Sequence, residues 1–251
     1  MFRLKSLDAT TLAIINPPPK PHPQPGMPLV DCSLAEFIAG QPQGFTHVAV
    51  AAAVFHEDRL LLVQRAETDS YPGHWELPGG SADPTDKSIS ESVGRELFEE
   101  TGLRMKRILA EILPPTTFST GWGKRQKTWL KASFVVEVTA ESKARVEQEV
   151  EMQGSQELTR KDSVIAVDPP VIKLHDKEHQ KYVWISAEEV IKNRVSMPGE
   201  NAMEFISADS VSTILEAFRL NKHIQKAEIG EALQVTRAFD DAARGARTGC
   251  Q

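Results

Sequence analysis

Three glutamates and one arginine stand close together in the segment 95–100, which reads Arg-Glu-Leu-Phe-Glu-Glu. On a helix, residues at i, i+3 and i+4 lie on one side, so Glu96, Glu99 and Glu100 can converge on a single site. Carboxylate oxygens are hard ligands that suit Mg²⁺, with Mn²⁺ as the alternative, and Mg²⁺ commonly binds substrate phosphates as well. The spacing therefore predicts a divalent-metal site for phosphate chemistry.

A solvated acidic face is the ordinary explanation of a glutamate-rich helix, but the helical positions argue against it here. With roughly 100° per residue, Glu96 and Glu100 fall on the same face as the apolar Val93 and Leu97. Ionised carboxylates are unfavourable on a packed face, and more so near the negative C-terminal end of a helix. A bound cation would offset this cost.

The residues around this helix resemble the Nudix box, Gly-x5-Glu-x7-Arg-Glu-U-x-Glu-Glu-x-Gly-U with U apolar. Residues 95–103 match the second half of that pattern at every fixed place. Segments 61–65 and 75–80 resemble the strand and glycine turn that precede the box, and 180–189 resembles a later strand and helix. The resemblance covers about 45–221.

The first half of the box departs from the family pattern. The loop from Gly80 to Arg95 is one residue longer, and Lys87 stands where the family has a glutamate that mainly braces the loop. We expect Asp86 or Asp83 to act as the brace instead.

The resemblance implies an α/β class fold, the Nudix-type α/β/α sandwich with a mixed β-sheet. It also implies a Mg²⁺-dependent hydrolase that cleaves the pyrophosphate bond of a nucleoside diphosphate linked to another moiety. Gly79, Glu96, Glu99 and Glu100 would hold the metal. The catalytic set would include Glu96, Glu99 and Arg95, the last orienting the glutamates.

A carboxylate outside the box is a further candidate for the general base. Glu178 stands just before an expected strand, where many relatives carry a glutamate, although an exposed loop glutamate is the plain alternative. Competing carboxylates are Glu147, Glu149 and Glu151.

Two upstream residues have less specific interpretations. Arg65 could meet phosphate or could be an ordinary surface arginine, and we expect Trp75 to pack in the core rather than stack on a base.

Strands and helices alternate along the rest of the chain. Apolar runs predict a β-hairpin over 47–55 and 59–64 and further strands over 128–138 and 181–185. Capping-box spacing predicts helices after Ser33 and Ser186. Apolar residues at i, i+3, i+4 and i+7 predict another helix, and these are Val211, Ile214, Leu215 and Phe218.

These elements suggest three regions. Residues 1–44 form a proline-rich arm with a short helix, and 45–222 form the main domain. A charged insertion occupies about 139–170 of that domain. Residues 223–251 form a tail of weak helical character whose last part we expect to be disordered.

Composition narrows the partners and the compartment. A net charge of −6 argues against folded nucleic acid and favours a small anionic ligand whose charge a cation offsets. The two cysteines, Cys32 and Cys250, cannot build a disulfide framework. The short apolar stretch at 12–15 is too brief for a membrane span, so we expect a cytoplasmic protein without a membrane partner, leaving a mitochondrial address and a homodimer open.

Two other function classes compete with the hydrolase. The degenerate loop and the proline-rich arm would also suit a non-catalytic Nudix fold that binds a nucleotide or a protein. An isomerase on the same fold is less favoured, because the cysteine near its active site has no evident counterpart here.

Overall fold

The computed structural model describes residues 29–41, 44–139, 169–192 and 203–248, with residues 231–248 as backbone only. The elements in chain order are η1 (Leu29–Asp31), α2 (Leu34–Ala39), β1 (His47–His56), β2 (Arg59–Arg65), β3 (Trp75–Glu76), α3 (Ile89–Thr101), β4 (Met105–Thr120), η2 (Gly123–Arg125), β5 (Lys127–Val138), β6 (His179–Ile185), α5 (Ala187–Lys192) and α6 (Ala208–Thr248). Within those ranges, no helix combines the length and apolar character that a membrane span requires.

A six-stranded mixed sheet forms the centre of the fold, with the order β3-β2-β1-β5-β4 and with β6 paired to β2. Strands β1 and β5 are parallel, whereas β1–β2, β2–β3, β2–β6 and β4–β5 are antiparallel. The predicted hairpin is confirmed as β1 and β2, and the other two predicted strands as β5 and β6.

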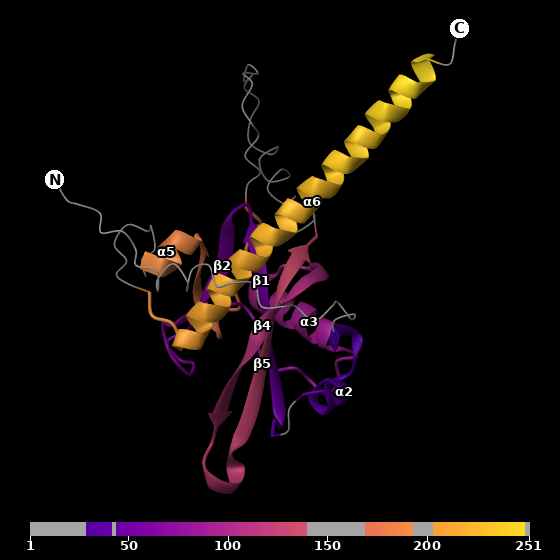
Figure 1. The fold of residues 1–251 in the computed structure, drawn as a ribbon. Coiled ribbons are helices and arrows are strands. Elements are labelled where there is room, and N and C mark those ends of the chain that lie inside the picture. Colours follow the sequence, from indigo (N-terminus) through magenta and orange to yellow (C-terminus); the bar gives the residue numbers. More distant parts are fainter. Residues whose placement is uncertain (1–28, 42–43, 140–168, 193–202, 249–251) are drawn as a thin grey trace, which may run out of the picture.

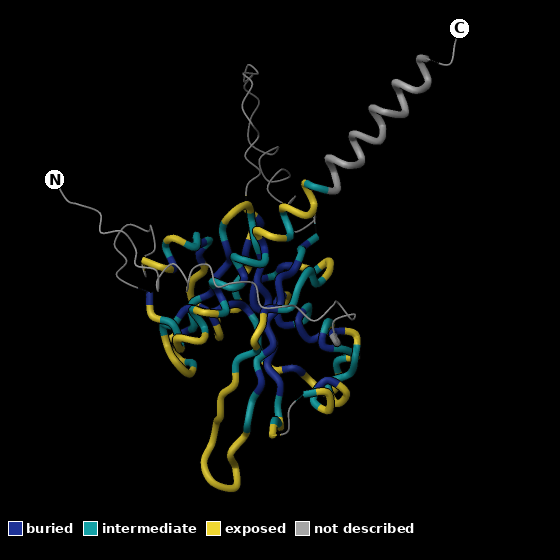
Figure 2. Tube along the Cα trace, in the orientation of Figure 1, coloured by how far each residue is buried: buried dark blue, intermediate teal, exposed yellow. Residues whose placement is uncertain are grey.

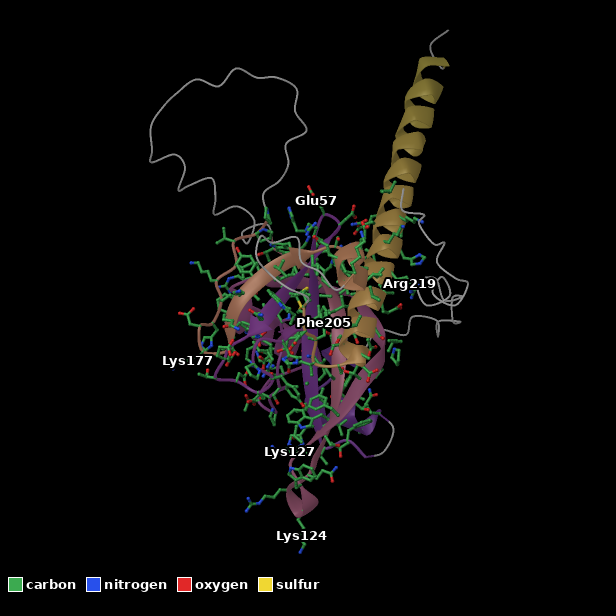
Figure 3. The ribbon with its side chains drawn as sticks, turned by 90° about the vertical axis from the view of Figure 1, so that its left-hand side faces the viewer. Glu57, Lys124, Lys127, Lys177, Phe205 and Arg219 are labelled. Atoms are coloured by element: carbon green, nitrogen blue, oxygen red, sulfur yellow. The ribbon has the colours of Figure 1, made fainter. Side chains whose placement is uncertain are left out.

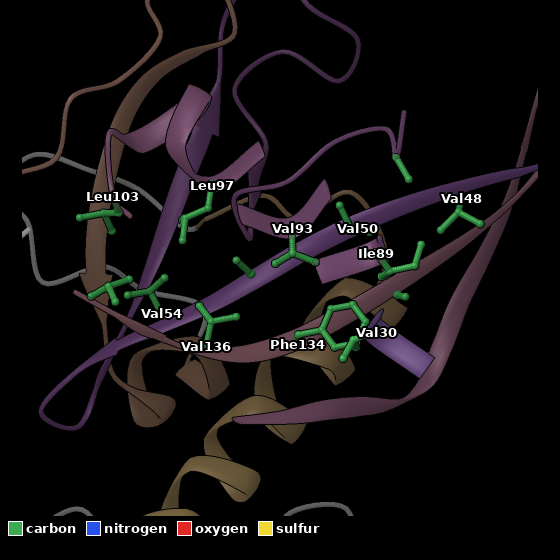
Figure 4. Close-up of a cluster of buried hydrophobic side chains, with 14 of the residues drawn as sticks. Val30, Val48, Val50, Val54, Ile89, Val93, Leu97, Leu103, Phe134 and Val136 are labelled. Carbon is green, nitrogen blue, oxygen red and sulfur yellow. The ribbon is translucent and has the colours of Figure 1, made fainter. Parts of the chain in front are cut away.

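Helices cover both faces of the sheet (Figure 1). On one face, Val93 and Leu97 of α3 pack with Val50 and Phe134 of the strands, as Figure 4 shows. On the other face, Ile214 and Ala217 of α6 belong to a second buried cluster. The predicted α/β/α sandwich is therefore confirmed, and alternate strand residues supply the two cores because successive side chains point to opposite faces.

Strand β4 is the main element that sequence patterns did not predict. Its sixteen residues include Pro114 and Pro115, and its pairing with β5 shifts register between Ile112 and Thr116. Proline lacks the N–H that a strand ladder needs, so the pairing is irregular there. The outer part of the β4–β5 hairpin is exposed, and Lys124 and Lys127 lie near its far end (Figures 2 and 3).

The segment 29–41 packs on the domain. Val30 and Phe37 are buried in the same cluster as α3, and the N–H of Ile89 donates to the carbonyl of Cys32 at 3.1 Å. The predicted capping box of α2 is confirmed by reciprocal hydrogen bonds between Ser33 and Glu36. Part of the predicted arm thus contributes core residues, while 1–28 lie outside the described residues.

The last helix is longer than the sequence indicated. Helix α6 continues without a break past residue 222 to Thr248, where we expected weak helical character and then disorder. In Figure 1 its C-terminal part extends away from the sheet. The expected insertion at about 139–170 lies almost wholly outside the described residues, so the three-region division stays a prediction.

Candidate active site

A glycine turn brings the segment before α3 alongside β1. Strands β1 and β2 pair only near their hairpin end, at Phe55 with Leu60 and at His56 with Arg59. Further along β1, the loop after β3 takes the place of β2. The N–H of Val50 donates to the carbonyl of Gly80 at 2.8 Å.

Glycine is required at position 79 by close approach to the backbone of β1, and Gly80 lies against the carboxylate of Glu96. A Cβ atom on Gly79, whose φ is +153°, would lie 2.1 Å from the carbonyl oxygen of Val50. A Cβ atom on Gly80 would lie 2.5 Å from Oε2 of Glu96. The turn therefore holds its backbone directly against the strand on one side and the carboxylates on the other.

Helix α3 presents the box glutamates in two environments. Ser88 caps its start, and Gly102 ends it in the left-handed conformation at φ 71°. Glu96 and Glu100 are buried on the packed face, which confirms the helical geometry expected for them. The side chain of Glu99 is 54% exposed.

Arg95 connects two of these glutamates to the loop. Its Nη1 lies 2.8 Å from Oε1 of Glu96 and 3.1 Å from Oε2 of Glu99. Its Nη2 lies 2.9 Å from Oδ2 of Asp86, and its Nη2 also donates to the carbonyl of Ser81 at 3.0 Å. The arginine thus orients the carboxylates while it is itself held by the loop.

Asp86, rather than Asp83, is the brace that contacts the arginine. Its hydrogen bond with Arg95 is the largest influence on its pKa and, with one from Ser92, lowers it below the ordinary value despite partial burial. Asp83 instead accepts a hydrogen bond from the N–H of Thr85 at 2.7 Å, which shapes the turn. The side chain of Lys87 is exposed.

Glu100 is a carboxylate buried next to other carboxylates. The N–H of Gly79 donates to its Oε2 at 2.7 Å. Burial is the largest cause that raises its pKa to about 9, and Glu76, Glu96 and Glu178 raise it further. Burial also raises the pKa of Glu96, against the effect of Arg95. Both shifts therefore favour the protonated form of the carboxyl group in the absence of a cation.

Glu76 is a buried carboxylate to which the sequence analysis assigned no role. Arg65 forms an ion pair with it, and Nζ of Lys131 lies 3.4 Å from its Oε2. Burial raises the pKa of Glu76, but Lys131, His179 and Arg65 together outweigh burial and lower it to about 2. Glu76 is thus charged and paired. The sequence signal for a buried carboxylate here is that Glu76 stands between the apolar Trp75 and Leu77.

The structure also brings a second segment to the cluster. One ligand atom each from Glu100, Glu178 and His179 lie within 4.8 Å of one another, so the candidate carboxylate outside the box is close to the box helix. Glu178 is exposed, whereas His179 is 3% exposed. His179 directly follows Glu178 in the sequence, but no local pattern marks it as a site residue.

The structure also shows the surroundings of Arg65 and Trp75, the two residues upstream of the box. Arg65 is partly buried and pairs with Asp69 as well as with Glu76, and its contact with phosphate stays a prediction. Trp75 is buried in the α6-side cluster, which confirms that it packs in the core. The competing carboxylates of the insertion, Glu147, Glu149 and Glu151, lie outside the described residues.

The residues present fit a divalent cation. Buried carboxylates with raised pKa values gain from a nearby positive charge, and the turn at Gly80 leaves no room for a side chain beside Glu96. Oxygen donors of this kind suit Mg²⁺ or Mn²⁺. The site could therefore hold a cation at the junction of α3 and the glycine turn.

Parts of this chain are similar in sequence to two known proteins. A MutT-like protein of Streptomyces ambofaciens is 43% identical over 72 residues, which cover 26% of this chain and 44% of the relative. An uncharacterized protein of Schizosaccharomyces pombe is 36% identical over 70 residues, covering 26% of this chain and 21% of that protein. The matches thus span less than half the length of either relative.

A solved structure and a family model extend the comparison. The crystal structure of a MutT Nudix hydrolase from Burkholderia pseudomallei is 14% identical and covers 68% of this chain and 96% of its own, with a TM-score of 0.42. The model of the NUDIX domain matches residues 45–204, which is more than half of the chain and includes the box and the Glu178 segment. The chain belongs to the Nudix family.

Proposed function

We propose that this protein is a divalent-metal-dependent hydrolase that cleaves the pyrophosphate bond of a nucleoside diphosphate linked to another moiety. The observation that carries the proposal is that the buried Glu96 and Glu100 both lie against the Gly79–Gly80 turn, while the exposed Glu99 is linked to Glu96 through Arg95. Buried carboxylates without full compensation suit a site completed by a cation. Mg²⁺ is the expected ion, with Mn²⁺ as the alternative.

Each residue of the site has a proposed role. Glu96, Glu99, Glu100 and the backbone of Gly79 would hold the cation, and Arg95 keeps the first two carboxylates oriented. When bound, the cation would supply polarisation of the phosphoryl oxygens and a lower pKa for the attacking water.

Glu178 is the proposed general base, because its carboxylate is exposed and adjacent to Glu100. It would take a proton from water as the water oxygen bonds to one phosphorus and the bridging P–O bond breaks. Two phosphate-bearing products result.

The brace at Asp86 favours an enzyme over a non-catalytic binding module. The lost box glutamate is the main reason to suspect inactivity, yet Arg95 is held through Asp86 at 2.9 Å. The orientation of Glu96 and Glu99 is therefore maintained by a different residue of the same loop.

Hydrolysis of a substrate panel with Mg²⁺ tests the proposal. The panel contains ADP-ribose, NADH, dinucleoside polyphosphates, CoA and nucleoside triphosphates, and phosphate-bearing products are separated by chromatography. We expect turnover of at least one member, dependent on the cation and retained in Lys87→Gln. Tight nucleotide binding without turnover of any member, with Mg²⁺ or Mn²⁺, would favour the binding module.

A further inference from the structure

His179 is a buried histidine that faces the carboxylate cluster. Its side chain is 3% exposed, and neither ring nitrogen has a hydrogen-bond partner among the described residues. Its Nε2 lies 4.0 Å from Oε1 of Glu100 and 3.9 Å from Oε1 of Glu76. A buried imidazole normally finds a partner for at least one nitrogen, so this arrangement needs an explanation.

An irregularity in strand pairing turns this side chain toward the site. Strand β6 pairs with β2 through Lys181 opposite Gln64, and then through His179 opposite Arg65, so that Gln180 is the extra residue. Residues directly opposite each other share one face of a sheet. Without the bulge, Gln180 would stand opposite Arg65, and His179 would point to the other face.

Glu100 and Glu178 each have a carboxylate oxygen close to His179. Glu100 accepts the Gly79 N–H with Oε2, and it is Oε1 that lies next to His179. The carboxylate of Glu178 completes the group of three ligand atoms within 4.8 Å of one another. Metal–ligand bonds of about 2.1 Å put opposite ligands about 4.2 Å apart, so the 4.0 Å between Nε2 of His179 and Oε1 of Glu100 suits two ligands of one ion.

We propose that His179 is a nitrogen ligand of the metal centre, together with Glu100 and beside the exposed carboxylate of Glu178, the proposed base. This rests on the proposed function and adds a ligand to it. The imidazole makes the site a mixed nitrogen and oxygen site, which binds first-row transition ions such as Mn²⁺, Co²⁺ or Zn²⁺ more tightly than Mg²⁺. The glutamates of α3 alone would provide only oxygen.

The test uses Mn²⁺ as a spectroscopic probe on the full chain, without substrate. Electron spin-echo modulation of bound Mn²⁺ reports a directly coordinated ¹⁴N nucleus, and uniform ¹⁵N-histidine labelling identifies that nitrogen as imidazole. We expect histidine ¹⁴N modulation in the wild type, its loss in His179→Gln and its persistence in His175→Gln. His175 is the matched control because its Nδ1 lies 3.7 Å from Oε2 of Glu178 on the same loop.

Affinity measurements by calorimetry accompany the spectra. We expect the dissociation constant for Co²⁺ to rise at least about tenfold in His179→Gln, with less than about threefold change for Mg²⁺. Circular dichroism checks the fold, and His179→Asn replaces the glutamine variant if that one does not fold. If neither variant folds, the spectra of the wild type and His175→Gln are compared. Histidine ¹⁴N modulation in both supports His179 as the ligand, and its loss in His175→Gln contradicts it.

The outcomes separate this inference from the proposed function. Stoichiometric Mn²⁺ binding without histidine modulation, or modulation lost only in His175→Gln, overturns the role of His179 and leaves the hydrolase intact. Absence of both Mn²⁺ binding and Mg²⁺-dependent turnover overturns the proposed function and this inference with it.

Discussion

Arg95 and Asp86 form a two-pronged ion pair, with Nη2 2.9 Å from Oδ2 and Nε donating to Oδ1 at 3.1 Å. This geometry fixes the plane of the guanidinium group as well as its position. The loop therefore keeps its hold on the box arginine even though Lys87 occupies the place of the family's glutamate. The adjacent aspartate performs the bracing role.

Replacing the brace should reduce activity while replacing its neighbour should not. We expect Asp86→Asn to lower turnover at least about tenfold, roughly 1.4 kcal/mol of barrier, because Arg95 loses its charged partner and the glutamates lose their orientation. Lys87→Gln, at an exposed position one residue later, should change turnover less than about threefold. Steady-state rates at saturating Mg²⁺ measure both. Equal losses in the two variants would mean that Asp86 is not the brace.

Binding of the cation should release a proton near pH 7. Without the cation, Glu100 with its pKa near 9 is mainly protonated there, and a metal ligand must be deprotonated. Calorimetric titration in two buffers of different ionisation enthalpy should show about one proton released, and Glu100→Gln should remove that release. Identical heats in the two buffers for the wild type would contradict the raised pKa.

The same raised pKa predicts how stability depends on pH. Between the ordinary value of 4.5 and about 9, the metal-free folded protein holds a proton on Glu100 that the unfolded chain has lost. The free energy of unfolding should therefore fall as pH rises through this window. Denaturant unfolding of the wild type and of Glu100→Gln measures the effect. In Glu100→Gln, the part of the decrease that Glu100 causes should be absent. If the unfolding free energy fell equally steeply with pH in both proteins, the raised pKa of Glu100 would be contradicted.

The segment 29–41 should contribute to stability, and residues 1–28 should not be needed. Phe37 is 2% exposed and packs in the core beneath α3, so Phe37→Ala should cost about 3–5 kcal/mol of unfolding free energy. Deletion of 1–28 should leave a folded, Mg²⁺-binding protein, because that proline-rich stretch lacks the periodicity of a core element. Chemical denaturation tests both, and insoluble protein after the deletion would show that 1–28 pack on the domain.

The burial of the box glutamates was predictable because helical periodicity acts locally. Glu96 and Glu100 follow Val93 and Leu97 at helical spacing, and the structure buries all four. The β1–β2 hairpin and the capping box at Ser33 were predictable for the same reason.

The features of the fold and site that the sequence did not predict depend on contacts between residues far apart in the chain. Strand β4 has two prolines and no clean alternation, and it is a strand because β5 offers it partners. The inward side chain of His179 depends on a bulge against β2, and the choice of Asp86 over Asp83 depends on where Arg95 reaches. Local sequence patterns contain no signal for either contact.

The most direct test of the central claim, that the α3 glutamates hold a catalytic cation, measures turnover and stability together in Glu99→Gln and Glu100→Gln. Each substitution removes a charged ligand and keeps the size of the side chain. We expect turnover at saturating Mg²⁺ to fall at least about a hundredfold in both, with nearly unchanged circular dichroism. The unfolding free energy of the metal-free protein should be nearly unchanged in Glu99→Gln and, above about pH 4.5, increased in Glu100→Gln. Near-wild-type turnover in either folded variant would contradict the assignment of that glutamate.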